Sequence, residues 1–229
     1  MAYTLLRHTA AGPGWFKSIL GEYGYSYTPE ELSRAHAPAR ELYLRATREG
    51  RDFEASMEQA VGFWQEYNSI ILHALGVTAA LHQEIARRIY TQAWDPTSWE
   101  LYPDVVPTLD ELRGRGIRLA LVSNFIDTLQ TVCAVNGIAD YFDTIVCSVE
   151  AGAMKPDPRI FQVALRRMEV PAARAWHVGD NYWADVLGAR AAGLEPVLID
   201  RARTGVRADC PVITTLDEVV DLIEERAAA

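Results

Sequence analysis

The first third of the chain carries apolar residues at helical spacing. In residues 15–94 the apolar positions recur every three or four residues, with no alternation typical of a strand. Turn and cap residues divide this stretch into four predicted helices, over 14–25, 28–50, 52–76 and 78–94. The second has the clearest start, with Thr28 as N-cap and Pro29 at the first helical position. We expect Pro38 to break or kink it.

The pattern changes near residue 100. Short apolar runs at 117–123, 143–148, 175–180 and 195–200 alternate with amphipathic segments, which predicts strands joined by helices. Such βαβ units form a parallel sheet covered on both faces. "AYTLL" (2–6) is predicted to be a strand of the same sheet. The sequence thus predicts an α/β core over 1–13 and 96–229, with an all-helical insertion over 14–95.

Composition narrows the classes of partner. The 229 residues are 49% hydrophobic and carry a net charge of −9, which argues against a nucleic-acid partner, although a small anion needs only a local positive pocket. No apolar run is long enough to span a membrane, and no signal peptide is visible. Three widely separated cysteines fit reduced thiols in the cytoplasm. We expect a cytoplasmic monomer or homodimer that binds a small anionic metabolite.

Candidate functional residues follow the predicted strands. Ligands of such sheets bind at the carboxyl ends of the strands. Ser123 and Asn124 end one strand and offer a hydroxyl and an amide for an anion, and Lys155 follows the next strand with a positive charge. Asp180 ends the third strand, and Asp185 follows it with a second carboxylate suited to Mg²⁺. Each residue alone could be a cap or a surface residue, but together they predict an anion site.

These motifs resemble those of the haloacid dehalogenase (HAD) superfamily of phosphatases and related hydrolases. "LALVSN" is similar to its second motif, "KPDPRIF" to its third and "VGDNYWAD" to its fourth. The resemblance implies that Ser123 and Lys155 bind phosphate and that Asp180 and Asp185 hold Mg²⁺. It covers roughly residues 97–201 and implies a HAD-like Rossmannoid parallel-sheet core. The helical insertion is similar to the cap of one branch, which closes over the site and selects the substrate.

The first motif of this family departs from the expected pattern. The family carries two aspartates one residue apart, a nucleophile and a general acid/base. Residues 1–21 contain no Asp or Glu. Placing the family pattern after "TLL" puts Arg7 at the nucleophile position and Thr9 at the acid/base position. Shifting the pattern by one residue puts His8 at the nucleophile position instead. An aspartate pair before residue 1 is not expected, because "AYTLL" already fills the strand.

Three functions stay open at this point. The first is a degenerate HAD protein without ordinary phosphatase activity that binds a small phosphate- or carboxylate-bearing metabolite. The second is an enzyme with other chemistry, using Arg7, His8, Thr9, Lys155 or Asp180. For this site we expect the Arg7 guanidinium to lie beside Asp180 in place of Mg²⁺. The third is a weak Mg²⁺-dependent hydrolase. "RHT" also resembles the "RHG" stretch of histidine phosphatases, with His8 as the phosphorylated residue.

Overall fold

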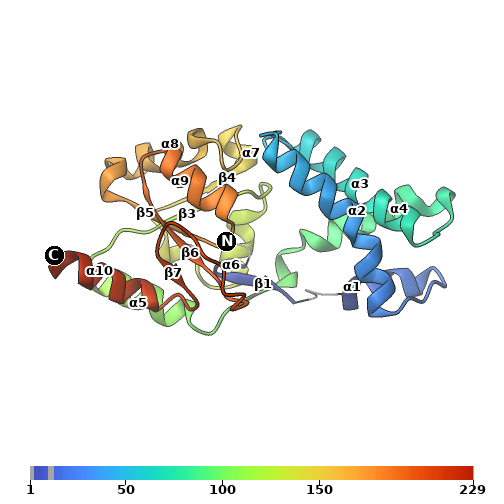
Figure 1. The fold of residues 1–229 in the computed structure, drawn as a ribbon, viewed down its shortest axis with the longest axis horizontal. Helices are drawn as coiled ribbons and strands as arrows, with labels where there is room; N and C mark the ends of the chain where they lie inside the picture. The colour runs from blue at the N-terminus through green and yellow to red at the C-terminus, as the bar shows by residue number, and fades with distance from the viewer. Residues whose placement is uncertain (1–2, 10–12, 229) are drawn as a thin grey trace.

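The computed structural model describes residues 3–9 and 13–228, and the statements that follow concern this part of the chain. Figure 1 shows two lobes, one helical and one built from strands covered by helices. The helical lobe contains α1 (Pro13–Glu22), α2 (Pro29–Arg48), α3 (Met57–Ala74) and α4 (His82–Ala93). In the described part of the chain, no helix is both long and apolar enough to cross a membrane.

The four predicted helices are confirmed, with shifted boundaries. Thr28 caps α2 in a reciprocal pair with Glu31: its hydroxyl accepts from the Glu31 N–H, and the Glu31 carboxylate accepts from the Thr28 N–H. The helix runs through Pro38, so the predicted break there is wrong. α3 begins after Ser56 and not at Asp52, because the Ser56 hydroxyl supplies the cap. Residues 51–56 therefore form a turn between α2 and α3.

The strand lobe has the predicted α/β architecture. Its parallel strands are β3 (Ala120–Ser123), β4 (Thr144–Cys147), β5 (Trp176–Gly179), β6 (Glu195–Ile199) and β7 (Val212–Ile213). Its longer helices are α5 (Val105–Gly114), α6 (Leu129–Val135), α8 (Pro158–Met168) and α10 (Glu218–Ala228), with the short α7 (Ser148–Ala151) and α9 (Gly188–Ala191). α8 and α9 cover one face of the strands, and α5 and α10 cover the other (Figure 1).

The parallel strands form two sheets rather than one continuous sheet. β3 pairs with β4, and β5, β6 and β7 pair in that order, all in parallel. Within the described chain no strand is hydrogen-bonded to both β3 and β5. Leu121 of β3 and Val197 of β6 nevertheless belong to the same hydrophobic core, so the two sheets form one lobe.

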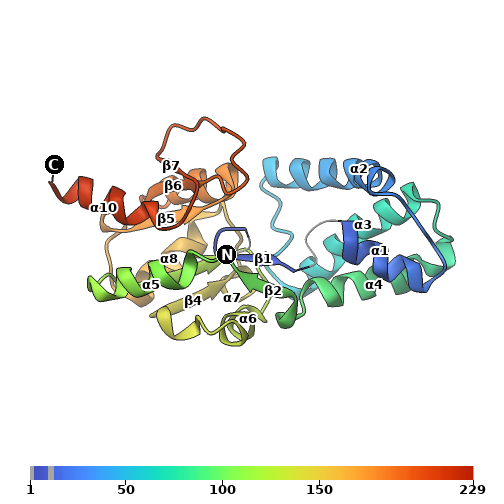
Figure 2. The same cartoon turned by 90° about the horizontal axis from the view of Figure 1, so that it is seen from below.

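The N-terminal strand lies elsewhere than predicted. β1 (Leu6–His8) pairs antiparallel with β2 (Trp99–Leu101), and residues 3–5 form a turn. The prediction that residues 2–6 form a strand of the parallel sheet is therefore wrong. The expectation about an aspartate pair before residue 1 rested on that strand, so the structure gives it no support. β1 and β2 are the two chain segments that lead into and out of the helical lobe (Figure 2).

Candidate functional site

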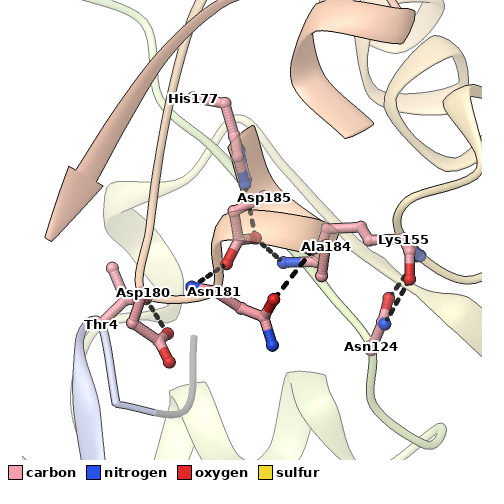
Figure 3. A network of polar contacts seen from close by, with 8 residues as sticks. All are labelled: Thr4, Asn124, Lys155, His177, Asp180, Asn181, Ala184 and Asp185. Carbon is pink, nitrogen blue, oxygen red and sulfur yellow. Dashed lines mark hydrogen bonds and ion pairs between the residues drawn. The ribbon is translucent and has the colours of Figure 1, made fainter. Parts of the chain in front are cut away.

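A buried ion pair lies at the centre of the site. Lys155 and Asp185 are 6% and 3% exposed, and the Lys155 Nζ donates to Asp185 Oδ1 at 2.5 Å. His177 of β5 contacts the same oxygen through Nε2 at 2.9 Å. The backbone N–H of Asn181 donates to Asp185 Oδ2 at 2.9 Å. Figure 3 shows His177 and Lys155 meeting at Asp185: His177 lies on β5, Asp185 in the helical segment Tyr182–Leu187 after it, and Lys155 in the turn before α8. Both carboxylate oxygens of Asp185 are thus occupied.

The protonation of this group follows from its contacts. Burial by itself would raise the pKa of Asp185, but the charge of Lys155 and the His177 hydrogen bond outweigh it and lower that pKa. Burial lowers the pKa of His177 and outweighs the opposite effect of Asp185, which favours the neutral imidazole. Burial and the negative charge of Asp185 raise the pKa of Asp180. The site therefore holds Asp185 ionised and His177 neutral near pH 7.

Gly179 makes room for the Asp185 carboxylate. A Cβ at Gly179 would lie 2.1 Å from Asp185 Cγ, far closer than any real contact. After this strand end, Asn181 caps the next helical turn by accepting from the Ala184 N–H at 3.0 Å. The helix predicted between the strands at 175–180 and 195–200 begins as a π-helix, Tyr182–Leu187, which brings the Asp185 carboxylate against Gly179 at the end of β5. The motif "VGDNYWAD" therefore builds this carboxylate pocket from local contacts.

Asn124 holds the backbone of Lys155. Its Nδ2 donates to the Lys155 carbonyl at 2.9 Å, and its Oδ1 accepts from the Lys155 N–H at 2.6 Å. Ser123, which is 3% exposed, ends β3 directly before it. Phe125 follows Asn124, and the Ser148 hydroxyl fixes its backbone by accepting a hydrogen bond from its N–H and donating one to its carbonyl. Both ends of the Asn124 amide are committed to Lys155, so this side chain positions the lysine.

The N-terminal turn reaches the site through Thr4. Its hydroxyl donates to Asp180 Oδ1 at 2.7 Å, and its carbonyl accepts from Arg201 Nε at 2.8 Å. Arg201 follows β6 and is paired with Asp104 at 2.9 Å, so the turn is fixed at the carboxyl ends of β5 and β6. Thr4 was not among the predicted site residues, because residues 2–6 were expected to form a strand that places Arg7 at the site.

Arg7, His8 and Thr9 lie on the antiparallel hairpin. The Arg7 Nε donates to Glu100 at 2.5 Å, and both side chains are about half exposed. The prediction that Arg7 lies beside Asp180 is therefore wrong, because cross-strand pairing places it opposite Glu100. His8 is buried edge-on against Trp99, with ring centroids 5.0 Å apart, and Thr9 donates to the Ser98 carbonyl. A catalytic role for these three residues stays a prediction.

The carboxylates provide a limited donor set for Mg²⁺. Among the described residues, no group of three or more His, Cys, Asp or Glu side chains gathers as a metal site. Asp185 is engaged by Lys155, His177 and Asn181. Asp180 has one oxygen on Thr4, and no described residue forms a hydrogen bond with its other oxygen. Because Mg²⁺ commonly binds one or two carboxylates together with water and phosphate oxygens, Asp180 is the protein ligand that fits it here.

The comparisons with known proteins identify the family. The model of the haloacid dehalogenase-like hydrolases matches residues 4–193, so the chain belongs to this family. The match favours this family over the histidine phosphatases, which the "RHT" stretch had suggested as an alternative. A solved structure has the same fold as this chain. It is a magnesium-bound HAD-hydrolase from Bacillus subtilis, which superposes with a TM-score of 0.76 at 20% identity and covers 98% of this chain and 96% of its own.

Curated relatives include several phosphatases. The human haloacid dehalogenase-like hydrolase domain-containing protein 3 is 38% identical over 152 residues, 66% of this chain and 59% of the relative. A Thermus thermophilus phosphoserine phosphatase is 41% identical over 127 residues, 55% of this chain and 50% of the relative. A ribulose-1,5-bisphosphate 5-phosphatase of Halopiger xanaduensis is 32% identical over 212 residues, 78% of this chain and 87% of the relative. The chain spans about six tenths of the human relative's length.

Proposed function

We propose that this HAD-like protein binds a small phosphate-bearing metabolite at the Lys155–Asp180 site and that residues 1–229 do not hydrolyse it through a phosphoaspartate. The observation that carries the proposal is the buried Lys155, held by Asn124 and Asp185 at the meeting point of the strand ends. Relatives named as phosphatases of phosphoserine, ribulose 1,5-bisphosphate and glyceraldehyde 3-phosphate support phosphate as the recognised group.

Lys155 supplies the positive charge for the phosphate. Its partner Asp185 fixes the ammonium group but also neutralises it, so a dianionic phosphate needs a further cation. Asp180 would hold Mg²⁺, which when bound would neutralise charge on the phosphate oxygens. Ser123 and the backbone N–H groups after β3 would donate hydrogen bonds to the same oxygens. The helical lobe would cover the site and exclude water.

Phosphoaspartyl chemistry needs a carboxylate nucleophile beside this phosphate. Residues 1–21 contain none, and the N-terminal residue that contacts Asp180 is Thr4, which carries a hydroxyl. A hydroxyl cannot form a phosphoaspartate, which requires a carboxylate as the nucleophile. We therefore expect ligand binding without the usual turnover.

Phosphate release tests this proposal. A panel of phosphomonoesters is incubated with the protein, with and without Mg²⁺, beside an Asp180→Asn variant purified in the same way. We expect no release above that of the variant, together with a ligand-dependent rise in Tm of the wild-type protein. Mg²⁺-dependent release that disappears in Asp180→Asn would show that the protein is a working phosphatase. That result would overturn the second half of the proposal.

A further inference from the structure

The residue before Lys155 is buried among side chains of the helical lobe. Met154 lies in the segment between α7 and α8 of the strand lobe, and it is 4% exposed. It belongs to an apolar cluster whose other buried members come from α2, α3 and the turn between them: Leu42, Ala46, Phe53 and Phe63. We call these five residues the interlobe cluster. In the described part of the chain, Met154 is the residue through which the strand lobe enters this cluster.

The helical side of the interlobe cluster is firmly held. The rings of Phe53 and Phe63 stack with their centroids 3.9 Å apart. The next residue in the turn, Glu54, is also buried, and its Oε1 accepts from the Trp64 indole N–H at 2.9 Å, which ties the turn to α3. A methionine side chain is flexible and makes favourable contacts with aromatic rings, so Met154 suits a place beside these two phenylalanines.

The backbone of Met154 is tied to the phosphate site. The Asp157 N–H donates to the Met154 carbonyl at 2.9 Å, which closes a turn around Lys155. Asn124 binds both the N–H and the carbonyl of Lys155, and the ammonium group of Lys155 lies on Asp185 (Figure 3). A displacement of Met154 therefore changes the backbone that presents the lysine. This short turn connects the aromatic rings of one lobe to the anion site of the other.

A second contact between the lobes begins in the same turn. Arg159, in the first turn of α8, pairs with Asp157 at 2.7 Å and with Asp52 of the helical lobe at 3.4 Å. The Arg159 side chain is more than half exposed, so water and salt screen this pair and it contributes little by itself. Burial of the Met154 side chain is therefore the stronger of the two contacts.

We propose that Met154 is a positioning residue that couples the contact between the lobes to phosphate binding at Lys155. The inference rests on the proposed phosphate-binding function. With Met154 inside the interlobe cluster, the turn presents Lys155 to the phosphate. When the helical lobe moves away, Met154 enters water and the turn loses that support. Such a coupling is reciprocal, so phosphate bound at Lys155 favours the arrangement in which Met154 is buried.

Truncation of the interlobe cluster tests the first direction of this coupling. Inorganic phosphate is titrated calorimetrically, with Mg²⁺, into the wild-type protein and Met154→Ala. We expect Met154→Ala to bind phosphate about tenfold more weakly, and Met154→Leu, which keeps the apolar volume, to restore most of the affinity. Leu42→Ala truncates the helical side and should also weaken binding, which keeps the test valid if Met154→Ala fails to fold. The control Met168→Ala, at a buried methionine outside the cluster, should bind phosphate as the wild type does.

Oxidation of methionine tests the reverse direction in the wild-type protein. Hydrogen peroxide converts an accessible methionine to its sulfoxide, and peptide mass spectrometry measures the rate at each position. We expect phosphate with Mg²⁺ to slow the oxidation of Met154 about fivefold or more. The buried Met168 and the exposed Met57 should keep their rates, since neither belongs to the interlobe cluster.

The outcomes separate this inference from the proposed function. Absence of phosphate binding in the wild type would overturn both. Phosphate binding of equal affinity in wild type, Met154→Ala and Leu42→Ala would overturn the role of Met154 and leave the phosphate site standing. Equal slowing of oxidation at Met154 and Met168 would have the same meaning, because it would show a general stabilisation of the fold and not a local coupling.

Discussion

Replacing Glu54 by Gln should change how the stability of the unliganded protein depends on pH. Burial raises the pKa of Glu54 from its ordinary value of 4.5 to about 7. A carboxyl whose pKa is higher in the folded state destabilises the fold when it ionises. This cost is absent below pH 4.5, grows between pH 4.5 and 7, and is complete above pH 7. Gln keeps an oxygen for the Trp64 indole and does not ionise.

The size of the effect follows from the pKa difference. Each pKa unit corresponds to about 1.4 kcal/mol, so ionised Glu54 costs roughly 3 kcal/mol. For a chain of this length, that difference corresponds to a shift in Tm of roughly 6–12 °C. We expect the unfolding free energy of Glu54→Gln, relative to wild type, to rise by this amount between pH 4.5 and 8. Urea unfolding followed by tryptophan fluorescence at several pH values measures it.

The comparison cancels contributions from other groups. The raised pKa of Asp180 affects both proteins in the same direction and drops out of the difference. The control Glu66→Gln, at an exposed position, should show a nearly constant difference across this pH range. A constant difference between wild type and Glu54→Gln would refute the reasoning, because it would mean that Glu54 has the same pKa in the folded and unfolded chain.

Three further substitutions test the construction of the site. Gly179→Ala should destabilise the protein by about 1–3 kcal/mol or more in urea unfolding, because the new Cβ collides with Asp185. The control Gly62→Ala, in open space within α3, should stabilise the protein by about 0.5–1 kcal/mol. Lys155→Met should cost about 3–5 kcal/mol, since it leaves a buried carboxylate unpaired, and a loss near zero would contradict the ion pair. Asn124→Ala should cost about 1–3 kcal/mol and weaken phosphate binding in calorimetry; unchanged binding would show that it does not position the lysine.

Much of the fold was predictable because its signals are local. Alternating apolar strands and amphipathic helices have characteristic periods, and caps such as Thr28 mark where helices begin. Lys155, Asp180 and Asp185 were predictable as a group because parallel strands bring their carboxyl ends to one edge of a sheet. In the structure Lys155 contacts Asp185, and the negative charge of Asp185 adds to burial in raising the pKa of Asp180.

The N-terminal segment was not predictable in the same way. "AYTLLRH" reads equally well as a strand of a parallel sheet or as a turn followed by a hairpin strand. Its partner, β2 at residues 99–101, lies more than 90 positions away, so its pairing is a tertiary effect that outweighs local preference. The burial of Glu54 was hidden for a similar reason, since a glutamate in a polar turn gives no sign that it will be buried and accept a hydrogen bond from a tryptophan ten residues later.

Calorimetric titration of inorganic phosphate in the presence of Mg²⁺ tests the central claim most directly. The protein is compared with Asp180→Asn, which keeps an oxygen for Thr4 but loses the charge that fits Mg²⁺. We expect saturable binding with one phosphate per chain in the wild type and an affinity at least about tenfold lower in Asp180→Asn. Absence of saturable binding in the wild type, or equal affinity in both proteins, would contradict it.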